Sequence, residues 1–391
     1  MKAEEKVNPY DPFRIFWLSL HFVNLYVYPS LHSDPVDVET LRRAAASKGG
    51  LLSNELRRKV WPKLLNINVY ELPYKPGKDG RENHKDYNQV VLDVSRSMKR
   101  FPKGMPSAER AVLQEQLVDI ILEVLRCNPQ LSYYQGYHDV AVTLLLVVGE
   151  RMAIAMLHTL SKYHLRDFMD PTMDSTKHIL NYLMPILEEV DKELHDFMIR
   201  AEVGTIFALS WLITWYGHVL SEFKHTLRLY DFFLASHPMM PIYLAATIVL
   251  HREQEVKQTE CDMAMLHHLL SRIPQDLPYE LLISQSQDLF RCYPPALLAK
   301  RPALQSRKSL SISTFKDFQL STLHQRPDTV LQPRHSGLDV ALPYDGVQQR
   351  GKGSRMVKMA VWGLSATLGA AIFAVAQTAM EWAPDVLLQL F

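Results

Sequence analysis

The sequence predicts an all-α fold, in which a multi-helix domain is followed by a flexible linker and one C-terminal transmembrane helix. From residue 33 onward apolar residues recur at helical spacing, and capping residues, Gly and Pro divide them into segments. No region shows the sustained alternation with a period of two that predicts a strand. Near the C-terminus, residues 359–380 contain no charged side chain.

The composition excludes several classes of protein. The 391 residues carry a formal net charge of +1, whereas a nucleic-acid partner would require a clear excess of Lys and Arg. The three cysteines, Cys127, Cys261 and Cys292, lack the short spacings of a zinc site or a disulfide framework. No phosphate-binding loop or hydrolase motif is present, and His138-Asp139 lacks the second His/Asp group of a metal phosphohydrolase. We expect no nucleic-acid partner and no metal.

Capping signals divide the domain expected over residues 33–298 into successive helices. The first should begin at a Ser33-Asp34-Pro35 cap and stop at Gly49-Gly50, and the second should begin at Ser53. The helices expected after these cover residues 85–101, 107–127, 136–149, 159–166, 175–190 and 191–200.

Two internal apolar stretches, residues 203–220 and 232–250, resemble membrane spans. Each is near the lower length limit for crossing about 30 Å of hydrocarbon, and both lie between amphipathic helices of one domain. We therefore interpret both as buried central helices. Residues 299–358, rich in Ser, Gln, Pro and Gly, are predicted to be a flexible basic linker with a short helical patch at 313–320.

The two ends of the chain are expected to differ in role. Residues 359–380 would form a helix of about 33 Å, which matches the bilayer core, and residues 381–391 would be a short lumenal tail. Lys and Arg side chains between residues 350 and 358 precede this tail anchor, so the positive-inside tendency places the domain in the cytosol. Residues 1–32 form an N-terminal segment of unclear role, whose apolar part is too short and too polar to predict a span.

Three short patterns could carry function. Arg57 and Trp61 stand four residues apart on one expected helix, and Val90-x-x-Asp93-x-x-Arg96 lies on the next one. Tyr133-Tyr134-Gln135-Gly136 lies on a loop after Asn128-Pro129. On a helical wheel Arg96 falls opposite its helix's apolar face, and Asp93, one turn back, can orient it. Taken by itself, that pair would be an exposed ion pair worth roughly a few tenths of a kcal/mol.

In this order and at this spacing, the three patterns resemble the TBC domain of Rab GTPase-activating proteins. The stretch Phe207-Ala208-Leu209-Ser210-Trp211 resembles that family's buried FAL-x-W helix, and Arg228-Leu229-Tyr230-Asp231 resembles its R-x-W/Y-D step. The resemblance covers about residues 50–295. The segment after Arg96 is three residues longer than the family's R-T-F-P continuation, and the spacing from Asp93 selects Arg96 over Arg100.

The resemblance implies a protein that accelerates GTP hydrolysis by Rab GTPases without an independent hydrolase site of its own. Arg96 would be an arginine finger and Gln135 a glutamine finger that orients the attacking water. The residues implied to position the fingers or bind the Rab are Asp93, Tyr133, Tyr134 and Gly136, and those implied to maintain the fold are Arg57, Trp61, Trp211 and Asp231. The partner would be a Rab in its GTP form, which brings its own Mg²⁺ and GTP, so no cofactor is expected in this chain.

The anchor further resembles that of the endoplasmic-reticulum-anchored member of the family, which acts on Rabs of the early secretory pathway. The expected location is therefore the endoplasmic reticulum membrane or the neighbouring cis-Golgi, with a single pass and the domain facing the cytosol. The alternative is a non-catalytic, membrane-anchored Rab-binding adaptor, against which the presence of both Arg96 and Gln135 argues. A helical-repeat scaffold is disfavoured, since no repeat of about 30–45 residues is found.

Overall fold

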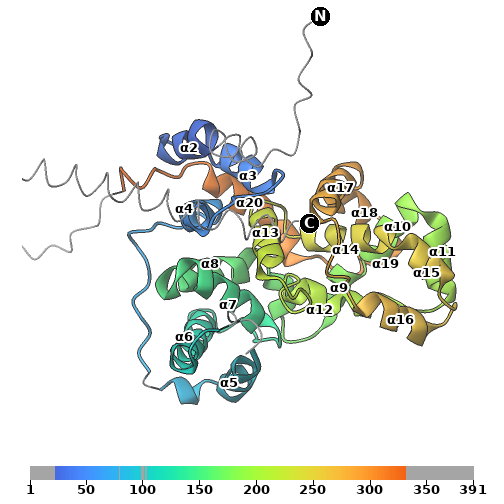
Figure 1. Ribbon diagram of the computed structural model, residues 1–391, viewed down its shortest axis with the longest axis horizontal. Helices are drawn as coiled ribbons and strands as arrows, with labels where there is room; N and C mark the ends of the chain where they lie inside the picture. Colours follow the sequence, from blue (N-terminus) through green and yellow to red (C-terminus); the bar gives the residue numbers. More distant parts are fainter. Residues whose placement is uncertain (1–22, 79, 98–100, 102–103, 332–391) are drawn as a thin grey trace, which may run out of the picture. The chain divides into compact units, whose positions relative to one another are not determined.

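The computed structural model describes residues 23–78, 80–97, 101 and 104–331. Throughout these residues the regular secondary structure is helical, with no strand (Figure 1), which confirms the all-α prediction for this part of the chain. None of the helices described here is both long enough and apolar enough to cross a membrane. The expected anchor at 359–380, the tail at 381–391 and most of the N-terminal segment lie outside the described residues.

The helices follow one another in three groups along the chain. The first group comprises η1 (Val23–Val27, a π-helical turn), α2 (Tyr28–His32), α3 (Val38–Ala46) and α4 (Asn54–Leu64). The second comprises η2 (Arg81–Asn83), α5 (Tyr87–Arg96), α6 (Ser107–Arg126), α7 (Tyr137–Val148), α8 (Glu150–Tyr163) and η4 (Arg166–Met169). The third comprises α9 (Asp174–Leu180), α10 (Leu183–Val190), α11 (Lys192–Arg200), η5 (Ile206–Ala208), α12 (Leu209–Ile213), α13 (Phe223–Leu234), α14 (Met240–His251), α15 (Glu253–Gln258), α16 (Met263–Ser271), α17 (Tyr279–Cys292), α18 (Pro295–Leu298), α19 (Pro302–Gln305) and α20 (Leu310–Thr322).

Local capping explains where several helices begin. The Ser53 hydroxyl accepts a hydrogen bond from the Leu56 amide, as the sequence predicts for the start of α4. The first predicted cap is wrong, because α3 begins at Val38 and is capped by Asp37, whose carboxylate accepts from the Thr40 amide. The Ser33 hydroxyl instead donates to the Ser30 carbonyl of the preceding helix, at 2.9 Å.

Other helix boundaries also differ from the prediction. Helix α5 ends at Arg96 rather than at 101, and α8 begins at Glu150, immediately after Gly149 ends α7 with a φ of 79°. The segment predicted as one helix over 175–190 is divided into α9 and α10. Apolar spacing by itself therefore does not locate these helix ends.

The two internal apolar stretches lie in the core, which confirms that they are buried segments of one domain. Helix α14 is surrounded by α10, α12 and α17 (Figure 1), and it is buried along almost its whole length. Neither stretch is one continuous helix. In the first, Trp215 and Tyr216 take positive φ values of 46° and 64°, so the chain turns away after α12. In the second, α14 begins only at Met240, after a break that follows α13.

The predicted flexible linker does not begin at residue 299, because residues 299–331 contain two helices and pack against the domain. The buried Asp167 carboxylate accepts hydrogen bonds from the Ser309 hydroxyl (2.6 Å) and from the amides of Leu310 (3.0 Å) and Ser311 (3.1 Å). It therefore satisfies the free amides at the start of α20 from another part of the chain. The helical patch expected at 313–320 is confirmed as part of α20.

Two aromatic side chains fix α20 to the core. Phe318 stacks on Tyr163 with ring centroids 4.5 Å apart, and Phe315 meets the His164 ring edge-on. The resulting burial lowers the pKa of His164 to about 3. Beyond α20, Gln325 donates to the Lys63 carbonyl at 2.7 Å, so the chain is held against α4 as well.

We expect a chain ending at residue 298 to be less stable than one ending at residue 331 by at least about 3 kcal/mol. The shorter chain loses the buried Phe315 and Phe318, each worth roughly 1.5–3 kcal/mol. Urea unfolding of the two chains, followed by circular dichroism, measures the difference. Equal midpoints would mean that α20 rests on the domain without stabilising it.

Candidate active site

The two candidate fingers lie on neighbouring elements and both reach solvent. Arg96 is the last residue of α5, and Gln135 lies on the loop between α6 and α7. Helix α5 turns Val90, Asp93 and Val94 inward, so Arg96 is exposed on the other side, as the helical wheel predicts. In the part of the chain described here, neither the Arg96 guanidinium nor the Gln135 carboxamide forms a hydrogen bond or ion pair. Both are available to an external ligand.

Asp93 connects the two elements. Its side chain is 1% exposed, and one carboxylate oxygen accepts a hydrogen bond from the Tyr133 hydroxyl at 2.9 Å. The other oxygen accepts from the Gln89 side chain at 2.9 Å. Among the described residues no hydrogen bond or ion pair joins Asp93 to Arg96, so the expected pair is not formed, and the Asp93 carboxylate accepts from Tyr133 and Gln89 instead. Residues Tyr133–Gly136, which we call the finger loop, are thus hydrogen-bonded to α5 through Tyr133 and Asp93.

The phenol of Tyr133 is held in its protonated form. Burial, and secondly the Asp93 charge, raise the pKa of Tyr133 far above its usual range. At neutral pH the hydroxyl therefore stays protonated and donates a hydrogen bond to Asp93. The same hydrogen bond fixes the residue two positions before Gln135.

The finger loop is fixed at its other residues too. The Tyr134 hydroxyl donates to the Ile213 carbonyl at 2.8 Å, and burial raises the pKa of Tyr134 well above its usual range. Gly136 has a φ of 109°, and a Cβ placed on it would lie 2.9 Å from the Thr214 side chain. Only glycine fits this close approach without strain. The loop thus packs directly against the end of α12.

The residues expected to maintain the fold form a buried cluster around Asp231, which has no exposed surface. Arg57 donates to both carboxylate oxygens, at 3.0 and 2.8 Å, and the Trp61 indole donates at 2.8 Å. The Leu51 amide adds a fourth bond at 3.1 Å. Burial raises the pKa of Asp231, and Arg57 opposes that shift. A Cβ on Gly50 would lie 2.6 Å from this carboxylate, so the turn between α3 and α4 requires glycine.

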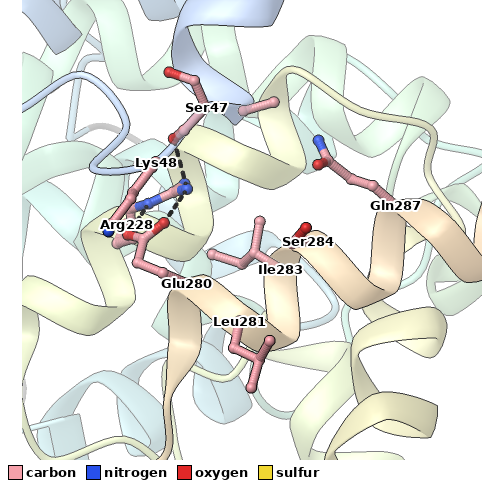
Figure 2. A pocket seen from close by; sticks show the side chains of 9 residues that line it. Ser47, Lys48, Arg228, Glu280, Leu281, Ile283, Ser284 and Gln287 are labelled. Atoms are coloured by element: carbon pink, nitrogen blue, oxygen red, sulfur yellow. Dashed lines mark hydrogen bonds and ion pairs between the residues drawn. The ribbon is translucent and has the colours of Figure 1, made fainter.

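A second ion pair lies next to this cluster. Arg228 donates two hydrogen bonds to Glu280 of α17, at 2.7 and 2.9 Å, and one to the Ser47 carbonyl at the end of α3 (Figure 2). A cavity of about 410 Å³ lies beside this pair, and Lys48, Leu281 and Gln287 are among the residues that line it. None of the finger residues lines it, so we assign it no part in the candidate site.

The remaining predicted residue, Trp211, belongs to the core. It is fully buried and packs edge-on against Phe207, with ring centroids 5.5 Å apart. Within the described ranges no group of three His, Cys, Asp or Glu side chains is placed to hold a metal ion.

Two residues beside the fingers were not predicted from the sequence. Gln89 supports Asp93 from one turn earlier on α5, a spacing that sequence reasoning could have found. His138 has its Nδ1 atom 3.4 Å from the Tyr133 hydroxyl oxygen. The sequence showed only an isolated His-Asp pair there, with nothing to indicate a contact with Tyr133.

The arrangement suits charge stabilisation on a bound partner. A guanidinium can hold two oxygens of a phosphate and keeps its charge at any physiological pH. A carboxamide can both donate to and accept from one water molecule. The fixed loop limits the conformational freedom of Gln135, which favours orientation of such a water.

Known proteins resemble this chain in sequence and in fold. Residues 54–257 match the Rab-GTPase-TBC domain family. TBC1 domain family member 20 from Homo sapiens is 61% identical over 369 residues, which cover 93% of this chain and 91% of that protein. GTPase-activating protein gyp10 from Schizosaccharomyces pombe is 34% identical over 254 residues, covering 64% of this chain and 68% of that protein. The crystal structure of the Ypt/Rab-GAP domain of Gyp1p matches with a TM-score of 0.57 and 14% identity, covering 70% of this chain and 99% of that structure.

Proposed function

This chain belongs to the TBC-domain family of Rab GTPase-activating proteins, and on that premise we propose that it supplies two catalytic side chains to a Rab in trans. Arg96 is the arginine finger and Gln135 the glutamine finger. The observation that carries this assignment is the partly buried hydrogen bond between Asp93 and Tyr133, which joins the two elements that expose Arg96 and Gln135.

The chemistry follows from where charge develops. In the transition state of GTP hydrolysis, negative charge spreads over the oxygens of the transferring phosphoryl group. The Arg96 guanidinium stabilises that charge more than it stabilises bound GTP, so it raises turnover rather than affinity. Gln135 orients the attacking water. The Rab in its GTP form contributes the nucleotide and Mg²⁺.

We further propose that the domain works at the membrane of the endoplasmic reticulum or the neighbouring cis-Golgi, on Rabs of the early secretory pathway. The uncharged stretch 359–380 and the basic residues that precede it support a single cytosol-facing anchor. An early-secretory location follows from the resemblance of this anchor to that of the family's endoplasmic-reticulum member.

We expect Gln135→Ala to lower the stimulated rate of GTP hydrolysis by about 10²-fold or more, since a fixed group that acts on the transition state typically contributes this much. Single-turnover hydrolysis on a panel of GTP-loaded Rabs measures the rate, and titration with the same Rabs measures affinity, which should change little. Gln285→Ala, at an exposed glutamine on α17, is the matched control.

The same assay separates catalysis from the adaptor alternative. An adaptor would bind GTP-loaded Rabs without accelerating hydrolysis, whether or not Gln135 is present. Stimulation by the wild-type chain together with its loss in Gln135→Ala supports the proposal. Stimulation that survives the substitution within a few-fold would remove Gln135 from the mechanism.

A further inference from the structure

His138 lies against the same tyrosine that holds the finger loop. It is the second residue of α7, and its side chain is mostly buried. Its Nδ1 atom is 3.4 Å from the Tyr133 hydroxyl oxygen, on a contact separate from the 2.9 Å bond between that hydroxyl and Asp93. Gln135 stands between Tyr133 and His138 in the chain.

Counting protons assigns the direction of this contact. The Tyr133 hydroxyl has one proton, and it uses that proton in the hydrogen bond to Asp93, because a carboxylate oxygen can only accept. The phenol oxygen can therefore only accept from His138, so Nδ1 of the imidazole must carry a proton. His138 thus donates to Tyr133 from Nδ1.

The other ring nitrogen faces a second buried carboxylate. Nε2 of His138 is 3.8 Å from Oδ2 of Asp139, and that oxygen is 3.4 Å from Nδ1 of His218. The Asp139 amide donates to the Gly136 carbonyl at 3.0 Å, so the carboxylate lies in the first turn of α7, where negative charge is favoured. A separation of 3.8 Å is too long for a hydrogen bond, so the Asp139 carboxylate lies near the ring without fixing it.

We infer that His138 is a positioning residue for the glutamine finger: by donating from Nδ1 to Tyr133, it fixes the loop that carries Gln135. The inference rests on the proposed function. Asp93 contacts the Tyr133 hydroxyl from α5, while His138 contacts it from α7, so two helices hold the residue two positions before Gln135. Loss of one support leaves the loop free to move, and the carboxamide then spends less time in the orientation that water activation requires.

Three substitutions at position 138 test the geometry. An asparagine amide can place a donor near the position of Nδ1, whereas a glutamine amide reaches the position of Nε2. His138→Ala and His138→Gln should therefore each lower the maximal stimulated rate by about tenfold or more, while His138→Asn should stay within about threefold of wild type. The affinity for a GTP-loaded Rab, measured by titration, should stay within about threefold for all three.

A double-mutant cycle shows whether His138 acts through Tyr133. In a Tyr133→Phe background the phenol oxygen is absent, so adding His138→Ala should cost no further rate. His178→Ala, which also removes a buried histidine, is the control for general loss of packing and should leave the stimulated rate unchanged.

The outcomes separate this inference from the proposed function. If Arg96→Ala and Gln135→Ala leave stimulation intact, the proposed function fails. If those two abolish stimulation and His138→Ala does not, only the role of His138 fails. The inference is likewise overturned if His138→Asn is as slow as His138→Ala, or if the losses add fully in the Tyr133→Phe background.

Discussion

Replacing Arg96 with alanine is expected to lower the Rab hydrolysis rate stimulated by this chain by about 10³-fold or more. An arginine supplied in trans contributes about 10³ to 10⁵ to the rate, because it neutralises charge that peaks in the transition state. The side chain is exposed, and no described residue bonds its guanidinium, so its removal leaves the fold intact. The affinity for a GTP-loaded Rab should change far less than the rate.

Single-turnover hydrolysis at saturating activator measures the effect. Arg96→Lys should recover little of the rate, since an ammonium cannot bridge two phosphate oxygens as a guanidinium does. Arg100→Ala, four residues along the chain and outside the described residues, is the matched control and should retain the wild-type rate. A large loss at Arg100 with none at Arg96 would transfer the finger to Arg100.

Replacing Asp231 with leucine should destabilise the domain by about 3–5 kcal/mol. The substitution leaves the Arg57 charge buried without its partner, and breaking a buried pair on one side typically costs this much. The Trp61 indole and the Leu51 amide lose an acceptor at the same time. Urea unfolding, followed by circular dichroism, measures the loss.

A second variant tests whether the lost stability comes from the unpaired charge of Arg57. Combining Asp231→Leu with Arg57→Met removes both charges, so the double variant should recover part of the lost stability. Glu280→Gln weakens the partly exposed pair with Arg228 and should cost much less. If Asp231→Leu alone is as stable as wild type, the cluster contributes nothing to the fold.

Sequence reasoning succeeded where a signal is local. Helix α6 follows its apolar spacing almost residue for residue, and Ser53 caps the helix that follows it, as predicted. The exposure of Arg96 follows from the periodicity of α5 alone. These features depend on contacts within one or two turns of helix.

It failed where a contact joins distant residues. The amides that begin α20 bond Asp167, which precedes Ser309 by 142 residues. The polar composition around Phe315 and Phe318 therefore led to the prediction of a linker, although both rings are buried in the structure. Likewise Asp93 bonds Tyr133, 40 residues away, rather than its helical neighbour Arg96. No periodicity within a segment encodes such pairs.

The packing of α20 shortens the part of the chain that could act as a linker to the proposed anchor. The described domain extends to residue 331, so the connection to the proposed anchor at 359 comprises residues 332–358, fewer than half of the linker expected from the sequence. At 3.3–3.6 Å per residue, even a fully extended chain of that length reaches only about 90–100 Å. With the proposed anchor in a membrane, this shorter tether would confine Arg96 and Gln135 to a thinner layer beside it, which would raise their effective concentration toward GTPases on the same membrane.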